Sequence, residues 1–333
     1  MAADNQVAPA PTYRPRLYKK LLSVPEIAIA AAVVVFFVIF VAADKNMASP
    51  ENLKRMALQG SMIGLAAYGM SYLVIAGEID LSAGATAALA AAVFGMLRFN
   101  QKWPEPACMA VALAAAALIG LLNSFVVLKV RMPSFFATLG SMFLASGLAV
   151  WLLQGKWLYI GDIIPFLSTS VKPSPIFGLP WVFVLLLPAY IIGDLFMRRS
   201  KLGPILTATG GNRRAAEIVG IHVPLLKTLC FVFVSVCAGM AGLVVGAYGG
   251  TTDANIGSDW MLWIIAIVII GGGSLRGGVG SLLGTLLGVV LVTTLRLGMA
   301  NAQVYSNAQG IVIGAVLIGA ASLDVVRRRT AQY

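Results

Sequence analysis

The chain has 333 residues, of which 59% are hydrophobic and only 11% are charged. Soluble domains carry about 25% charged residues, so this composition excludes a soluble globular protein. A net charge of +11 would suit a nucleic-acid partner, but Lys and Arg stand in short clusters at the ends of apolar runs, as membrane topology requires. The three cysteines lie inside apolar segments and there is one histidine, so we predict no disulfide framework and no metal site.

In chain order, a polar segment rich in Ala and Pro comes first, and we predict a disordered cytoplasmic tail over residues 1–20. A transmembrane domain follows over residues 21–327, and residues 328–333 form a short cytoplasmic tail. Within this domain, apolar runs cover residues 25–43, 56–76, 82–97, 107–128, 134–153, 180–197, 225–248, 260–271, 279–298 and 304–323.

Most of these runs approach the length of about 20 residues that an α-helix needs to cross a bilayer. We therefore predict an all-α integral membrane protein, a bundle of about ten transmembrane helices of which some are discontinuous. An even number of spans puts both termini on one side. About two thirds of the Lys and Arg residues fall on that side, which predicts that both termini are cytoplasmic.

Two features predict interrupted helices. The eighth run is short, and the second is followed almost without a loop by residues 77–84, which read Gly-Glu-Ile-Asp-Leu-Ser-Ala-Gly. Unwound backbone inside a membrane is tolerated where it lines a cavity, as in transporters. Glu78 and Asp80 are costly to desolvate there. Either Asp80 and Ser82 cap the third helix, or these residues belong to a pathway or its gate, or they couple transport to protons or cations.

The longest predicted inner loop covers residues 198–227. Asn212 has the residue type of a helix N-cap and Gly220 that of the C′ position, so we predict a helix of about two turns between them. So short a helix rarely holds alone in water, which favours a partner surface that accepts its small face, made of Ala215, Ala216 and Val219. The alternative is a solvated basic loop that only fixes topology.

Residues 271–280 are rich in glycine but lack the Gly-Lys-Ser/Thr ending of a nucleotide loop, which occurs nowhere in the chain. We interpret them as a tight turn into the ninth span, whose Gly280, Gly284 and Gly288 allow close helix packing. Most spans also lack the titratable groups that an intramembrane enzyme needs on facing helices. The sequence therefore predicts no catalytic residue and no cofactor site.

Four motifs together resemble the permease subunits of ribose-type (monosaccharide) ABC importers. Residues 77–84 are similar to that family's Gly-x-Ile-Asp-Leu-Ser-Val-Gly signature, and residues 133–140, 210–221 and 271–280 resemble further segments of it in the same order. Residues 210–221 resemble its cytoplasmic signature and 271–280 its glycine-rich segment. Ala83 replaces the usual valine, and Glu78 is an extra acid at a variable position, where it would bear on substrate choice.

The resemblance implies a translocating subunit for a monosaccharide or related polyol, surrounded by lipid in a bacterial plasma membrane. It implies a second permease (identical or related), a cytoplasmic ATP-binding-cassette ATPase and an extracytoplasmic sugar-binding protein as partners. We assign the pathway and its gate to Gly77, Glu78, Asp80, Ser82, Tyr68, Ser71, Thr138 and Ser141. By the same likeness, the residues that couple to the ATPase are Gly210, Gly211, Asn212, Arg213, Arg214, Ala215, Ala216, Glu217 and Gly220.

Two alternatives belong to other functional classes. An ion-coupled secondary transporter of a small polar solute would require acids or unwound carbonyls as ion sites, and only Glu78 and Asp80 qualify. An intramembrane enzyme would act on a lipid or lipid-linked substrate with no other subunit present.

Overall fold

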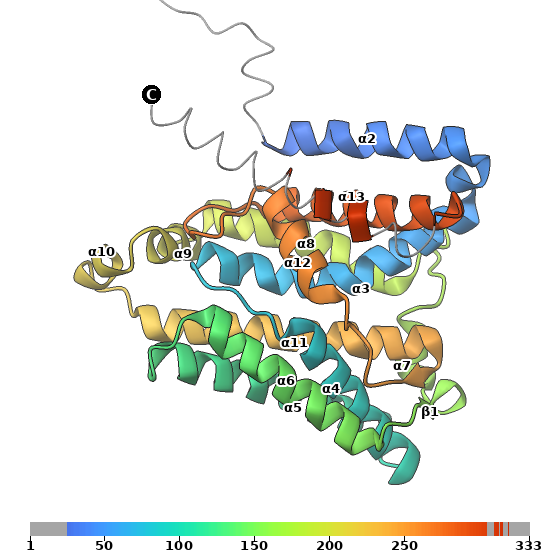
Figure 1. Cartoon of the computed structure of the whole chain (residues 1–333), viewed down its shortest axis with the longest axis horizontal. Coiled ribbons are helices and arrows are strands. Elements are labelled where there is room, and N and C mark those ends of the chain that lie inside the picture. Colours follow the sequence, from blue (N-terminus) through green and yellow to red (C-terminus); the bar gives the residue numbers. More distant parts are fainter. Residues whose placement is uncertain (1–24, 305–309, 313, 316–318, 320–333) are drawn as a thin grey trace, which may run out of the picture.

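The computed structural model describes residues 25–304, 310–312, 314, 315 and 319, so the predicted tails and most of the tenth apolar run lie outside the described residues. The described part is almost entirely helical (Figure 1). Its longer helices are α2 (Pro25–Ala43), α3 (Pro50–Ile75), α4 (Ala83–Gly95), α5 (Glu105–Leu128), α6 (Ser134–Leu153), α8 (Trp181–Arg199), α11 (Val223–Gly249), α12 (Trp260–Ile270) and α13 (Leu282–Asn301).

Eight segments are long and apolar enough to cross a membrane, counting α4 together with the π-helical turn Met96–Asn100 that continues it. The prediction of a helical membrane bundle is therefore confirmed for the described residues. α12 corresponds to the short eighth run. It has 11 residues and spans about 16 Å at 1.5 Å per residue, which is too short for a hydrocarbon core of about 30 Å.

Four helices, α3, α4, α11 and α13, form the centre of the bundle. Between 67% and 78% of their spanning residues are buried, against 6% for α2, which packs along α13 at one side (Figure 1). α4 is rich in alanine, and its small side chains allow α5, α6 and α11 to pack closely around it. The exposed apolar side chains lie mainly on α2, α5, α6 and α8, which is expected of surfaces that contact lipid or another bundle.

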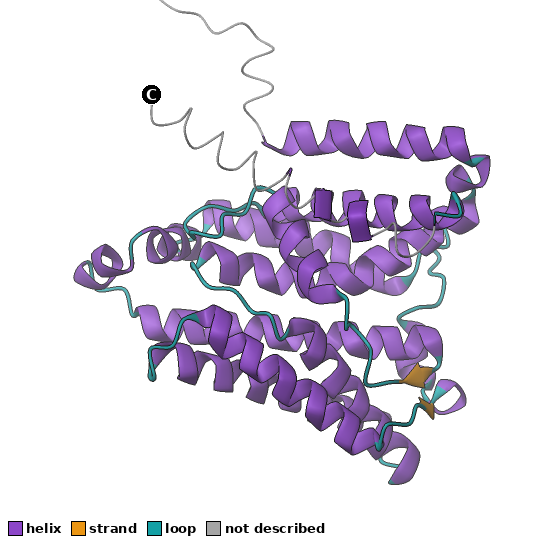
Figure 2. Ribbon diagram, viewed as in Figure 1, coloured by secondary structure: helices purple, strands orange, loops and turns teal. Residues whose placement is uncertain are grey.

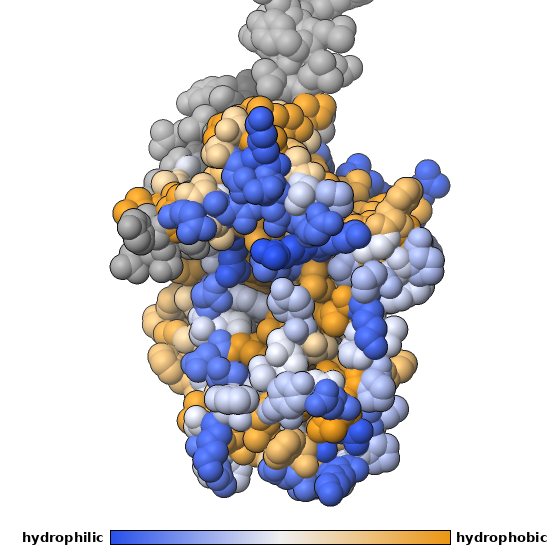
Figure 3. Space-filling model, turned by 90° about the vertical axis from the view of Figure 1, so that its right-hand side faces the viewer, coloured by the Kyte–Doolittle hydropathy of each residue, from blue (hydrophilic) through white to orange (hydrophobic). Residues whose placement is uncertain are grey.

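The two ends of the bundle differ. At one end, on the left in Figure 1, lie the short helices α9 (Leu202–Gly211) and α10 (Arg213–Ile218), and we call it the α10 end. At the other end, the β1 end, lie α7 (Pro165–Thr169) and the antiparallel strands β1 (Leu158–Tyr159) and β2 (Thr251–Thr252), drawn in orange in Figure 2. Figure 3 looks onto the β1 end and shows hydrophilic residues spread across it between hydrophobic ones, which suits a surface in contact with water.

The glycine-rich segment 271–280 turns the chain from α12 into α13, as predicted. A Cβ on Gly284 would overlap the carbonyl oxygen of Gly271, and one on Gly288 would overlap that of Ile267. The two helices therefore pack backbone against backbone, which confirms the predicted use of small residues. α13 begins three residues later than predicted because Ser281 accepts a hydrogen bond from the Gly284 amide and caps the helix there.

Glu105, at the start of α5, organises the β1 end. Its buried carboxylate accepts hydrogen bonds from the amides of Phe166 (3.0 Å) and Leu167 (2.5 Å), which have no partner inside the first turn of α7. Glu105→Ala is expected to leave both donors unsatisfied, at about 1–3 kcal/mol each. Hydrogen exchange at these two amides should become faster while exchange in α13 stays constant. Equal exchange in variant and parent would show that α7 does not depend on this carboxylate.

Candidate functional site

Residues 77–82 form the break between α3 and α4, at the α10 end. α3 ends at Ile75, and two residues later Gly77 takes the left-handed conformation at a φ of +82°. The Gly77 amide donates to the carbonyl of Val74, and the Glu78 amide donates to that of Leu73. These two bonds form a Schellman motif, which satisfies carbonyls that a helix end would leave unpaired. The break is therefore an ordered, hydrogen-bonded turn.

Asp80 is buried in this break and ties it to α5. Its Oδ1 accepts hydrogen bonds from the amide (2.7 Å) and hydroxyl (2.5 Å) of Ser82, and its Oδ2 accepts one from the side-chain amide of Asn123 (3.3 Å). Burial raises the pKa of the Asp80 carboxyl, and the bonds from Ser82 and Asn123 partly oppose this. Asn123 also donates to the Ser82 hydroxyl (3.0 Å). A polar cluster of three side chains thus fixes the break.

The predicted capping of α4 by Asp80 and Ser82 is wrong. Ser82 occupies the N-cap position, but its side chain makes no capping bond. The carboxylate of Asp80 accepts the amide of Ser82 itself, which precedes the first helical residue, Ala83. The hydroxyl donates to Asp80 instead of accepting from the helix amides, so both side chains serve the contact with α5.

Glu78 forms a buried ion pair that sequence reasoning missed. The Nζ of Lys227 lies 2.6 Å from the Oε1 of Glu78. The side chain of Lys227 is only 6% exposed and that of Glu78 only 13%. Lys227 is 149 residues further along the chain, in the second turn of α11. A cation of the same chain therefore holds Glu78, which argues against the expectation that this acid is free to select the substrate or to bind a coupling ion.

The short helix α10 has both caps that the sequence predicts. The Oδ1 of Asn212 accepts a hydrogen bond from the Ala215 amide (3.0 Å), which is an N-cap. Gly220 has a φ of +86°, and its amide and that of Ile221 donate back into the last turn, which is a Schellman motif. The predicted helix is confirmed and has six residues.

The face that α10 presents agrees with the predicted one only in part. Ala216 is 2% exposed and points into the chain, so the expectation that it contacts a partner is wrong. Val219, which belongs to the predicted face, is 75% exposed, and Ile218, which does not, is 85% exposed. Nothing in residue type alone distinguishes the two sides of so short a helix. Its other predicted contact residues are exposed, namely Arg213, Arg214, Ala215 and Glu217.

Three glycine segments that are distant in the sequence meet beside α10, and we call the contact among Gly77, Gly210 and Gly277 the glycine junction. A Cβ on Gly210 would overlap the carbonyl oxygen of Ile75 and lie 2.5 Å from the amide nitrogen of Gly278. One on Gly277 would lie 2.6 Å from the Cα of Gly77. The Gly278 amide also donates to the Ile75 carbonyl (2.8 Å). The ends of α3 and α9 and the turn before α13 therefore touch through backbone alone.

The four predicted polar wall residues do not meet in one place. Tyr68 lines an apolar cavity of about 580 Å³ between α3, α5, α7, α8 and α11. Ser71 is buried and donates a hydrogen bond to Thr285 of α13 (2.9 Å). Thr138 and Ser141 are buried on α6 and donate to carbonyls of their own helix. In this conformation, only Tyr68 among the four faces that cavity.

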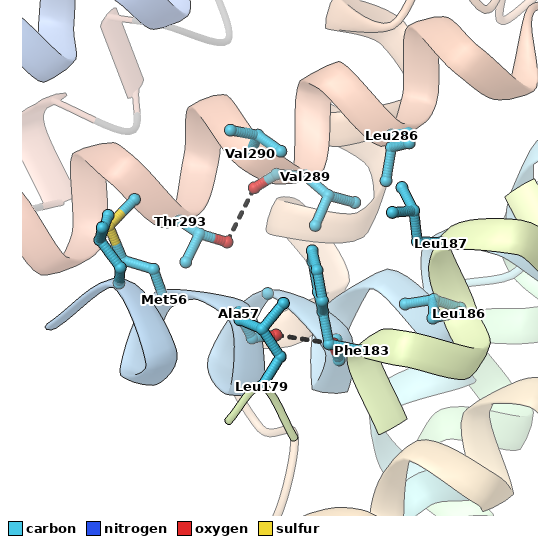
Figure 4. Close-up of a pocket in the computed structure, with 13 residues that line it drawn as sticks. Met56, Ala57, Leu179, Phe183, Leu186, Leu187, Leu286, Val289, Val290 and Thr293 are labelled. Atoms are coloured by element: carbon cyan, nitrogen blue, oxygen red, sulfur yellow. Dashed lines mark hydrogen bonds between the residues drawn. The ribbon is translucent and has the colours of Figure 1, made fainter. Parts of the chain in front are cut away.

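A second apolar cavity, of about 350 Å³, lies between α3, α8 and α13 (Figure 4). Its two hydroxyls are already used, because Ser61 donates to Ala57 (2.6 Å) and Thr293 donates to Val289 (2.7 Å) within their own helices. A site for a polar ligand needs polar groups that are free to contact it. Neither cavity offers such a row of groups, so neither has the lining of a sugar pathway.

Comparisons with known proteins identify the family. Residues 52–321 match the family described as the permease component of branched-chain amino acid transport systems. The chain is also similar to the Autoinducer 2 import system permease proteins LsrD of Photorhabdus laumondii (29% identical) and Escherichia coli (28% identical), over 298 residues that cover 88% of this chain and 89% of each relative. The likeness to importer permeases that the four motifs predict is confirmed. The chain therefore belongs to this family of multi-pass membrane permeases, which are transport components and not enzymes.

Proposed function

We propose that the chain is the membrane-spanning subunit of an ATP-driven importer for a monosaccharide or related polyol in a bacterial plasma membrane. It pairs with a second permease, identical or related, and α10 docks on a cytoplasmic ATP-binding-cassette ATPase. An extracytoplasmic sugar-binding protein delivers the solute at the β1 end. The motifs shared with ribose-type permeases support the substrate class, and the relatives named for import support the direction.

The shape of α10 carries this proposal. A capped helix of six residues is too short to be stable alone, and it exposes Ile218 and Val219 where no part of the described chain covers them. Arg214 beside them supplies positive charge that steers an acidic partner surface, while the charge of Arg213 is shared with Glu217 (2.9 Å). Basic residues also gather at the neighbouring helix ends, including Lys129 after α5, which supports a cytoplasmic α10 end. This proposal keeps both termini cytoplasmic, as the distribution of Lys and Arg predicts.

The pathway, in this proposal, runs along the contact with the second permease, because the two apolar cavities described above offer no row of free polar groups to a solute. The break between α3 and α4 forms the cytoplasmic gate, with Gly77, Asp80 and Ser82 as its parts. Ser71, Thr138 and Ser141 would line the pathway only in a state in which α3 and α6 have moved apart from their present neighbours.

Replacing Ile218 and Val219 together with aspartate is expected to weaken binding of the ATPase. The change removes two apolar contacts and places two negative charges in the interface, and loss of a binding hot spot costs about 2 kcal/mol or more, which is about 30-fold in the dissociation constant. The dissociation constant between the ATPase and the permease in lipid nanodiscs measures this directly.

Val130→Asp is the matched control, because Val130 is also apolar and 57% exposed but belongs to the turn between α5 and α6. We expect its dissociation constant to equal that of the parent. Parental affinity in the Ile218 and Val219 variant would rule out the docking role. Accumulation of solute in liposomes by the permease with no ATPase present would contradict the proposed function as a whole.

A further inference from the structure

The Glu78–Lys227 ion pair connects two parts of the molecule that the proposed function requires to move together. Glu78 belongs to the break between α3 and α4, and Lys227 lies on α11. α11 begins at Val223, only a short turn after α10 ends. A displacement of α10 therefore reaches Lys227 through a single turn and the start of a long helix. From Lys227 it reaches the break, because the ammonium group of Lys227 lies 2.6 Å from the Glu78 carboxylate.

Stability alone does not explain this pair. Both side chains lose their hydration on burial, and a buried ion pair is often no more stabilising than neutral side chains of similar size. Such a pair instead fixes the relative position of the two elements, because both charges lose a partner when the elements move apart. Among the ion pairs of the described residues, this is the only one that joins α11 to the break.

The glycine junction holds the same break from a second side. At this junction the backbone of Gly210, in α9, lies against the end of α3. The ion pair holds the side chain of Glu78, the residue after Gly77, against α11. α9 and α11 flank α10 in the chain. The break is thus attached to both elements through which α10 is connected to the bundle, once by backbone packing and once by charge.

We propose that the Glu78–Lys227 ion pair is a positioning latch, which transmits movement of α10 to the break and so makes gate opening depend on ATP hydrolysis. This inference rests on the proposed function and extends it, since it assigns the transmission to two side chains. Both are positioning residues. They act through the break and need not touch the solute or the nucleotide.

The test uses the complete transporter, with its ATPase and binding protein, reconstituted in liposomes. The permease carries Glu78→Gln with Lys227→Met, which removes both charges, or Glu78→Lys with Lys227→Glu, which reverses them. For each, we measure the unfolding temperature, the amount of ATPase that copurifies, solute uptake, and the stimulation of ATP hydrolysis by loaded binding protein. Asp259→Asn, which breaks the exposed pair between Asp259 and Arg296 (2.9 Å), is the matched control.

We expect the neutral variant to unfold at the parental temperature and to retain the ATPase, but to lose about tenfold in stimulation, within the roughly 5- to 150-fold range of allosteric couplings. The reversed variant should recover most of the stimulation, and the control should equal the parent.

Parental stimulation in the neutral variant would overturn the latch and leave the proposed function intact. If the neutral variant does not fold, the reversed one decides: a folded, coupled protein supports the latch and a folded, uncoupled one overturns it. A parental permease that binds no ATPase would overturn the proposed function instead.

Discussion

Replacing Gly210 with alanine is expected to abolish transport. The added Cβ would overlap the carbonyl oxygen of Ile75 and lie 2.5 Å from the amide nitrogen of Gly278. Both are backbone atoms, so neither can turn aside, and the glycine junction must open. Overpacking of this kind costs about 1–3 kcal/mol, occasionally more. It would also separate α9 from the end of α3, and hence α10 from the break. Solute uptake by the reconstituted transporter, together with the unfolding temperature of the permease, measures both effects.

Gly147→Ala provides the control for this prediction. Gly147 is exposed within α6, and a Cβ there would meet nothing within 4 Å. Alanine is favoured over glycine inside a helix by about 0.8–1.0 kcal/mol, so the control should fold at least as well as the parent and transport at the parental rate. A Gly210→Ala permease that transports normally would show that backbone contact at the junction is not needed for coupling.

Local patterns gave correct predictions where the structure depends on residues near one another in the chain. The helix between Asn212 and Gly220 follows from an N-cap side chain and a residue that accepts a positive φ, and both act within one turn of their own position. The membrane-spanning helices follow in the same way, because apolar length alone decides whether a segment can cross a bilayer.

Contacts between distant segments could not be predicted from these patterns. Nothing in the sequence near Glu78 indicates Lys227, since the pair forms only when α11 packs against the break. The burial of Ala216 has the same origin, because the side of α10 that faces the bundle is set by α9 and α11. The three segments 77–84, 210–221 and 271–280 are each recognisable in the sequence, but only the fold shows that Gly77, Gly210 and Gly277 occupy one contact.

Asp80→Ala is expected to destabilise the permease and impair transport. The substitution removes the acceptor for the Ser82 amide and for Asn123, and a buried polar group without a partner costs about 1–3 kcal/mol. Asp80→Asn should recover only part of this loss. Its amide replaces one of the two carboxylate oxygens with a donor, and the Ser82 and Asn123 groups that face this position are themselves donors. Chemical denaturation in detergent measures the free energy of unfolding of the parent, of Asp80→Asn and of Asp80→Ala, and we expect it to fall in that order.

The matched control for Asp80 is Asp253→Ala. Asp253 also accepts a hydrogen bond from the amide two residues ahead, that of Asn255 (2.9 Å), but this bond is exposed to solvent. Surface substitutions usually stay within about 0.5 kcal/mol, so the control should change little. If Asp80→Ala were as mild as Asp253→Ala, the polar cluster with Ser82 and Asn123 would not fix the break. A loss of transport at unchanged stability would instead mean that the carboxylate acts in the movement of the gate itself, because its bonds to α5 would then matter only when α3 and α4 change position.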